Sequence, residues 1–221
     1  MTTSTIELVP FSQIADQVLP ELRGVPLPTI ERAFARVAKD FFEFTDAWRI
    51  TFDNMPLVAG VSQYPLPVEL YGDAVMLNKV ISVTYGPRKL IAASEITVQN
   101  RFGNWRDQTG RVDFYYVDRG EVLNLALPPS EDSHKDLLSV LTTLKPTLRT
   151  RFLPADLYYE YEDTLLEGVL GMLARSANKN WTDPQLAGIH LQGYEMAKLR
   201  ARSHVKHEDT AKVRTARYGG Y

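Results

Sequence analysis

The hydrophobic period changes twice along this 221-residue chain, and this change constrains the fold more than any single motif. Between about residues 29 and 46 apolar side chains recur at the 3.6-residue period of a helix. From residue 49 to about 150 the apolar stretches are short and bounded by Gly, Pro and Asn, a pattern typical of strands. The helical period returns at Pro154. The sequence therefore predicts an α+β fold in which a small antiparallel β-domain interrupts a helical bundle.

These boundaries predict three parts. Residues 1–48 and 151–203 form a discontinuous helical domain, and residues 49–150 form the β-domain. Residues 204–221 contain almost no large aliphatic side chains, so they cannot bury enough apolar surface to order themselves. We expect this last part to be a flexible, extended C-terminal tail.

Two helices are expected in the C-terminal part. The first runs for about six turns from Pro154, and Gly168 and Gly171 on its apolar stripe indicate the close approach of a neighbouring helix. Thr182 is the expected N-cap of the second helix, because Gln185 then stands at the capping-box position. The stripe expected to face the first helix comprises Leu186, Ile189, Gly193 and Ala197.

A hairpin is the clearest prediction within the β-domain. Its strands, Val112–Val117 and Val122–Leu127, flank a tight turn in which Gly120 can adopt a positive φ. The segment 93–110 has no settled period, so we expect a loop with at most one helical turn.

Charge is unevenly distributed, although the formal net charge is only −2. Residues 198–221 carry seven basic and two acidic side chains, whereas the other 197 residues carry 18 basic and 25 acidic ones. A basic end on an acidic body fits an acidic partner, either a nucleic acid or a protein groove, and it fits a solvated, disordered end equally well.

Residues that would carry chemistry are scarce. The chain has no cysteine and no known nucleophile, nucleotide-binding or zinc-protease motif. His204, His207 and Glu208 lack a third anchor for a metal, and the carboxylates at 160–167 fit a solvated helix face. No catalytic, metal or cofactor site is predicted, and no apolar run is long enough to span a membrane. The N-terminus also lacks the pattern of a signal peptide.

Contact residues are better candidates. Trp105 and Arg106 mix aromatic and basic character in the irregular segment, which fits either contact with a partner or a surface loop with one core tryptophan. Tyr158 and Tyr159 begin a helix and fit either packing or an interface, so these four are the candidates for a contact outside the basic end. Partner-binding side chains in the basic end comprise Lys198, Arg200, Arg202, Lys206, Lys212, Arg214, Arg217, Tyr218 and Tyr221.

Five motifs in order resemble the head-to-tail connector, or adaptor, proteins of tailed bacteriophages. They are VLPELRGVPLPTIERAFARVAKDFFEFTDAW at 18–48, VSQYPLP at 61–67, LALPPS at 125–130, LTTLKPT at 141–147, and LYYEYEDTLLEGVLGMLARSANKNWTDPQLAGIHLQGYEMAKLRAR at 157–202. The resemblance as a whole extends over about two-thirds of the chain. Family members commonly have Cys near the position of Phe42, which this chain does not.

The resemblance implies a structural virion protein, made in the host cytoplasm and placed at the head–tail interface. It implies a ring, of about twelve copies, that docks on the portal protein through the C-terminal tail. Such a ring extends the DNA channel, lets DNA pass without sequence-specific binding, and provides the attachment site for a downstream tail or neck protein. It needs no cofactor, enzyme activity or membrane.

Two other classes of function stay open on the residues alone. The basic tail and the Trp105 loop fit a nucleic-acid binding module. Glu160 and Glu167 are the residues on which an enzyme hypothesis would depend.

Overall fold

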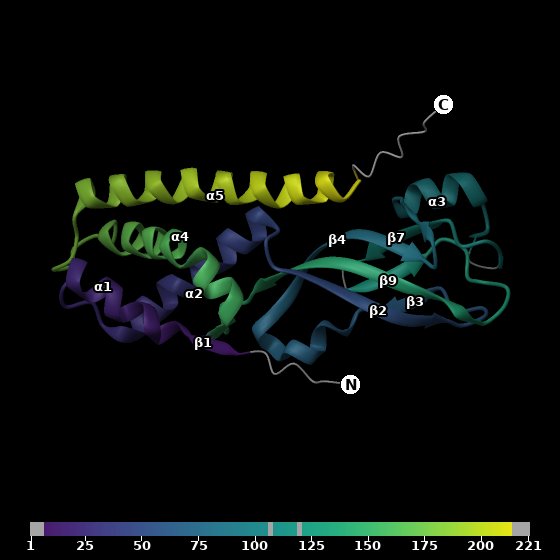
Figure 1. The fold of residues 1–221 in the computed structure, drawn as a ribbon, viewed down its shortest axis with the longest axis horizontal. Helices are drawn as coiled ribbons and strands as arrows, with labels where there is room; N and C mark the ends of the chain where they lie inside the picture. Colours follow the sequence, from purple (N-terminus) through teal and green to yellow (C-terminus); the bar gives the residue numbers. More distant parts are fainter. Residues whose placement is uncertain (1–6, 106–107, 119–120, 214–221) are drawn as a thin grey trace, which may run out of the picture. The chain divides into compact units, whose positions relative to one another are not determined.

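The computed structural model describes residues 7–105, 108–118 and 121–213 (Figure 1). The chain forms two compact units. Unit 1 comprises the residues up to Trp48, Asp73–Met76 and the residues from Lys145 onward, and unit 2 comprises Arg49–Gly72 and Leu77–Leu144. Helices and antiparallel sheets together confirm the predicted α+β class.

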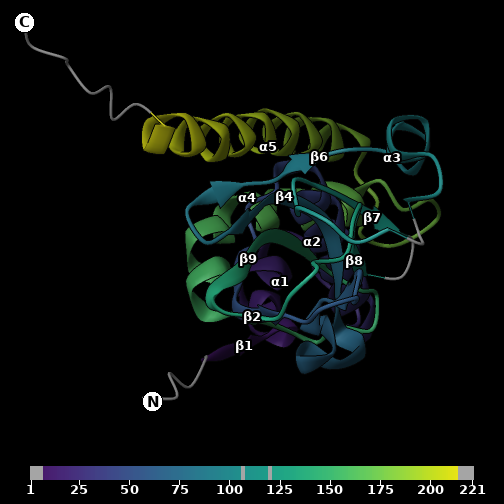
Figure 2. The same ribbon diagram turned by 90° about the vertical axis from the view of Figure 1, so that its right-hand side faces the viewer.

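Unit 1 is built from helices and one short two-stranded sheet. Its elements are β1 (Leu8–Pro10), η1 (Phe11–Ile14), α1 (Ala15–Glu21), α2 (Leu27–Thr45), β10 (Phe152–Pro154), α4 (Ala155–Ala174) and α5 (Pro184–Val213). Strand β1 pairs with β10 in antiparallel orientation and so links the N-terminal segment of unit 1 to its C-terminal segment. Helix α5 lies along α4 and α2 in both views (Figures 1 and 2).

Aromatic side chains fill the core of unit 1. Phe34 and Phe41 of α2 are fully buried and lie 6.1 Å from the ring of Tyr158 and 4.8 Å from that of Tyr161, respectively. The apolar face predicted for residues 29–46 is therefore confirmed, because α2 turns this face toward α4.

The two glycines of α4 are close-approach positions, as predicted. A Cβ atom on Gly168 would lie 2.5 Å from Val37 Cγ1 and 2.9 Å from Tyr194 Cδ2. A Cβ atom on Gly171 would lie 2.8 Å from Leu191 Cγ. Since no real side chain tolerates such distances, glycine lets α2 and α5 pack against α4.

The start of α5 differs from the prediction. Asp183, and not Thr182, is the N-cap, because Asp183 Oδ1 accepts hydrogen bonds from the amides of Gln185 and Leu186, both at 3.0 Å. The Thr182 hydroxyl instead donates to the carbonyl of Ser176 and accepts from the amide of Lys179. Thr182 thus shapes the loop between α4 and α5.

The buried face of α5 also differs from the predicted stripe. Ile189 is 67% exposed, whereas Ala187, Tyr194, Lys198 and Val205 are buried. In addition, α5 continues ten residues beyond the predicted boundary at residue 203. A formed helix propagates through charged residues of good helix propensity at little cost, so a polar segment can extend it.

Unit 2 contains two four-stranded sheets. The first has the order β2 (Arg49–Leu57), β9 (Ser133–Pro146), β4 (Val75–Tyr85) and β5 (Arg88–Lys89), with β4 beginning in unit 1. The second has the order β3 (Gln63–Pro65), β8 (Val122–Leu125), β7 (Phe114–Asp118) and β6 (Ile91–Ala92). Antiparallel pairing holds for β2–β9, β3–β8 and β7–β8, but β6 runs parallel to β7. The 3-10 helix η2 (Pro67–Ala74) precedes β4.

The predicted hairpin is confirmed as β7 and β8, which pair from Asp118↔Val122 to Tyr115↔Leu125. The expected turn residue Gly120 lies outside the described residues. The prediction of a loop over 93–110 is wrong in part, because α3 (Glu95–Phe102) forms there. Ser94 caps α3 by accepting from the amide of Thr97 at 3.1 Å.

Candidate interaction surfaces

Lys198 is buried and belongs to a polar network, and it is not part of an exposed basic tail. Its ammonium donates hydrogen bonds at 2.8 Å to Asp40 of α2 and at 2.8 Å to Glu195 of α5. It also lies 5.1 Å from the ring centroid of Phe44 and 4.8 Å from that of Tyr194. Because this charge is satisfied within unit 1, Lys198 leaves the predicted partner-binding set.

The network raises the pKa of Tyr194 and that of Lys198. Tyr194 donates to Asp40 Oδ2 at 2.8 Å, and burial, followed by this hydrogen bond, raises the pKa of Tyr194. Burial by itself lowers the pKa of Lys198, but hydrogen bonds to Asp40 and Glu195 more than offset it, so the pKa of Lys198 is raised. A neutral tyrosine and a charged lysine thus hold α5 on α2.

The other predicted basic residues have different surroundings. Arg200 is exposed on α5, whereas the guanidinium of Arg202 lies 4.5 Å from the ring centroid of Phe44. Lys206 is exposed, and the backbone of Lys212 lies in the last turn of α5. Arg214, Arg217, Tyr218 and Tyr221 lie outside the described residues. Arg200 is therefore the clearest surface cation of the predicted set.

Trp105 is a core residue of unit 2. It is 5% exposed, packs with Val98 and Ala126, and meets the ring of Tyr116 edge-on at 5.8 Å. It also forms part of the wall of a polar cavity of about 240 Å³, whose other lining residues include Ser62 and Asn124. Trp105 is thus buried and not presented to a partner, and its neighbour Arg106 lies outside the described residues.

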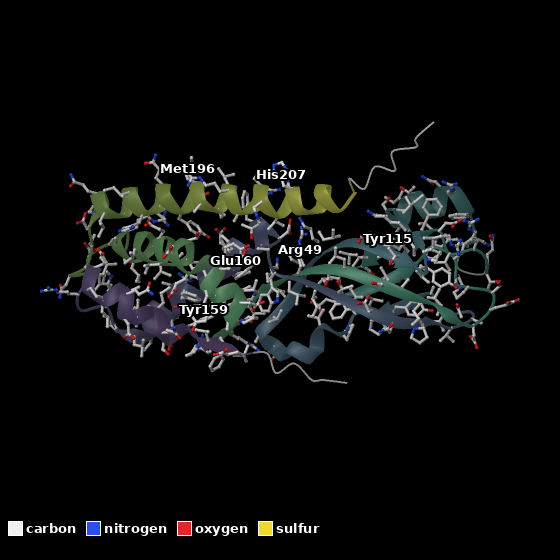
Figure 3. All side chains as sticks on the ribbon, in the orientation of Figure 1. Arg49, Tyr115, Tyr159, Glu160, Met196 and His207 are labelled. Atoms are coloured by element: carbon white, nitrogen blue, oxygen red, sulfur yellow. The ribbon has the colours of Figure 1, made fainter. Side chains whose placement is uncertain are left out.

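The two tyrosines at the start of α4 have opposite roles. Tyr158 is fully buried, and burial, with the Glu162 carboxylate as the next cause, raises the pKa of its hydroxyl. Tyr159 is 56% exposed. Figure 3 shows Tyr159 and Glu160 on the part of α4 that contacts β1. Of the pair, only Tyr159 is available for contact with another molecule.

An acidic surface surrounds Tyr159. Asp156, Glu160 and Asp163 are exposed, and none of them forms an ion pair or hydrogen bond with another described residue. Phe152, just before α4, is 50% exposed. We call these five residues, Phe152, Asp156, Tyr159, Glu160 and Asp163, the acidic α4 face. Of these five residues, the sequence predicts a contact role for Tyr159 alone.

The remaining carboxylates of this helix have structural partners. Glu162 accepts a hydrogen bond of 2.6 Å from Gln17, and Glu167 lies 2.7 Å from His190 Nδ1. Residues 160–167 are thus divided between packing and solvent, which gives the enzyme hypothesis no paired site. Across the described ranges, no three His, Asp or Glu side chains gather as a metal site would require.

A basic hollow lies between α2 and α4. Arg32 and Arg36 border it together with the hydroxyl residues Thr29 and Ser176, and its volume is about 200 Å³. The two arginines are exposed, and neither has a carboxylate partner within the described part of the chain. The apolar lining comprises Ala33, Met172 and Leu173. We call this hollow the arginine groove.

Sequence analysis missed the arginine groove, although a signal for it exists. Arg32 and Arg36 stand four residues apart on one helix face, where like charges repel each other. A like-charge pair at this spacing on an exposed face is a mild cost to the helix that a partner's carboxylates would offset.

The protein is a two-unit α+β protein whose unit 1 carries a basic groove and an acidic helix face. The family model described as SU10 adaptor protein matches residues 9–217, and the chain belongs to this family. The resemblance to phage head-to-tail adaptors is thereby confirmed, and the protein is a bacteriophage structural adaptor. No curated protein matches the chain. None of the described helices has the length and apolar character to cross a bilayer.

Proposed function

We propose that this protein is a head-to-tail adaptor that forms a ring on the portal, extends the DNA channel and provides the attachment site for the tail. The observation that carries the proposal is the family match, which spans nearly the whole chain, residues 9–217. The proposal gives the protein a place in the virion, with the portal, a downstream tail or neck protein and its own copies as partners.

The C-terminal end is the proposed portal contact. Without Lys198, the candidate side chains begin with Arg200 on α5 and continue through Arg202, Lys206 and Lys212 to Arg214, Arg217, Tyr218 and Tyr221. Their positive charge favours an acidic groove on the portal. Two terminal tyrosines add aromatic anchors, which carry much of the binding energy in protein interfaces.

We propose that different parts of the chain make the different contacts. In this proposal the helices of unit 1 up to Leu199 serve ring assembly, and the C-terminal end from Arg200 onward serves portal docking. The β-domain, residues 49–150, is the part that we propose to bind the downstream tail or neck protein of the phage. An acidic body suits a DNA channel, because negative walls repel phosphates and let the duplex slide.

A portal pull-down with three variants tests the docking proposal. Deleting residues 214–221 leaves Pro184–Val213 of α5 in place. Loss of portal binding by this variant would therefore point to the C-terminal residues and not to unfolding. Arg200→Glu is expected to weaken binding, whereas Lys179→Glu, an exposed lysine before α5, is the matched control. Full binding by both the deletion and the Arg200 variant would remove the C-terminal end from the mechanism.

The second candidate is a nucleic-acid binding module, favoured by the six basic residues that follow Lys198 in the chain. It predicts an affinity for duplex DNA that falls steeply as the salt concentration rises and that is lost when the C-terminal residues are deleted. The adaptor proposal predicts weak DNA retention by the isolated chain. Salt-dependent filter binding distinguishes the two.

A further inference from the structure

Unit 1 carries two exposed surfaces of opposite charge. The arginine groove presents Arg32 and Arg36, and the acidic α4 face presents three carboxylates around Tyr159. Neither set of charges is neutralised by another described residue. Two unneutralised and complementary surfaces on one chain indicate a contact between copies.

We propose that the acidic α4 face of one subunit docks into the arginine groove of the neighbouring subunit. This inference rests on the ring proposed above and names the surfaces that would close it. Guanidinium groups bind carboxylates through two parallel hydrogen bonds, so Arg32 and Arg36 can each receive one carboxylate.

The apolar residues of the two surfaces also complement each other. Tyr159 shares a face of α4 with the carboxylates, Phe152 lies in β10 just before this helix, and both are at least half exposed. The groove offers them Ala33, Met172 and Leu173 as apolar lining between the arginines and Ser176. Aromatic and arginine side chains dominate the binding energy of protein interfaces, and this contact contains both.

Within the described part of one chain, no ion pair joins the two surfaces. Asp156 stands in the first turn of α4, and Met172, which lines the groove, follows sixteen residues later. At 1.5 Å per helical residue, about 24 Å of α4 separate them. A contact between two different surfaces is heterologous, and repeated heterologous contacts produce a ring when the rotation closes.

Helix stability accounts for only part of the acidic α4 face. Asp156 stabilises the first turn of α4 through the helix dipole, but this effect fades beyond that turn. Glu160 and Asp163 lie further along, where the dipole gives no such benefit. A partner's positive charges would account for all three.

Cross-linking tests the contact directly, because the chain contains no cysteine that would react in the background. The variant Arg32→Cys/Asp156→Cys is treated with a short bis-maleimide. A disulfide would not suffice, because the Cα atoms of a paired arginine and carboxylate lie further apart than the roughly 4.4–6.8 Å that a disulfide spans. The full chain is tested both concentrated alone and mixed with the portal protein. We expect a ladder of dimers, trimers and higher species in at least one sample.

Three controls define the result. Each single-cysteine variant must stop at the dimer, and Arg32→Cys/Gln192→Cys, whose second site lies on the exposed side of α5, must give no ladder. Absence of a ladder from both samples overturns the inference. If portal binding persists in that case, the proposed function survives, so the two failures are distinguishable.

Charge reversal tests the chemistry of the contact. Arg32→Glu/Arg36→Glu and Glu160→Arg/Asp163→Arg should each weaken self-association at least about tenfold, measured by native mass spectrometry with and without the portal. Combining all four changes should restore it. A combined variant that stays defective, or reversals that change only salt-dependent DNA retention, would contradict a subunit contact.

Discussion

At the scale of single residues, Asp40 joins two helices through one carboxylate oxygen. Asp40 Oδ2 accepts 2.8 Å hydrogen bonds from both the Tyr194 hydroxyl and the Lys198 ammonium. Tyr194→Phe is expected to lower the free energy of unfolding by about 1 kcal/mol, since the Asp40 side chain is 56% exposed and water partly replaces the lost donor. Urea unfolding measures this, with Tyr159→Phe on the exposed α4 surface as the neutral control. Equal stability of the two variants would contradict the network.

The same network makes stability depend on alkaline pH. The pKa of Tyr194 is raised from 10.0 and that of Lys198 from 10.5. The folded state therefore keeps protons that the unfolded state loses, and stability falls as pH rises above about 10, by about 1.4 kcal/mol per pH unit for each proton difference. Unfolding free energies measured from pH 8 to 11 check this. Tyr194→Phe should reduce the slope, and an unchanged slope would contradict the assignment.

At the scale of elements, glycine determines how closely α4, α2 and α5 pack. Gly168→Ala should cost about 1–3 kcal/mol, because the new methyl group would overlap Val37 and Tyr194. Gly188→Ala on α5 is the matched control, since nothing lies within 4 Å of its Cβ position. This control should gain about 0.5–1 kcal/mol from helix propensity. Thermal denaturation of both variants gives the comparison, and a stabilising Gly168→Ala would contradict the packing.

Elements with a strong apolar period were predictable from the sequence, and elements without one were not. The face of α2 was found because Ile30, Phe34 and Phe41 are apolar and buried. The face of α5 was misplaced because one of its buried positions is Lys198, whose partner Asp40 lies 158 residues away in sequence. Helix α3 was missed because Val98 is its one buried residue.

The candidate surfaces show the same limit. The basic residues of 198–221 were visible as composition, but the burial of Lys198 depends on contacts between distant elements. Tyr158 and Tyr159 are neighbours in sequence, and only their places on α4 decide that one is core and the other surface. The arginine groove needs α2 and α4 together, so no local pattern defines it.

At the scale of the whole molecule, the proposed adaptor acts through shape and charge. Membership of the SU10 adaptor protein family gives it a structural role in a phage. The proposed ring joins copies through the arginine groove and the acidic α4 face and leaves the C-terminal end for the portal. Separate surfaces for the two contacts predict that Arg32→Glu/Arg36→Glu impairs assembly while its monomers still bind an isolated portal. Surface plasmon resonance on immobilised portal measures this, and loss of binding by folded monomers would show that the contacts overlap.

Electron microscopy of the purified protein mixed with its portal shows whether the chain assembles as proposed. The account predicts a closed ring of this chain seated on the portal, coaxial with its channel. Portal particles that remain bare at saturating concentrations of the folded chain would contradict it.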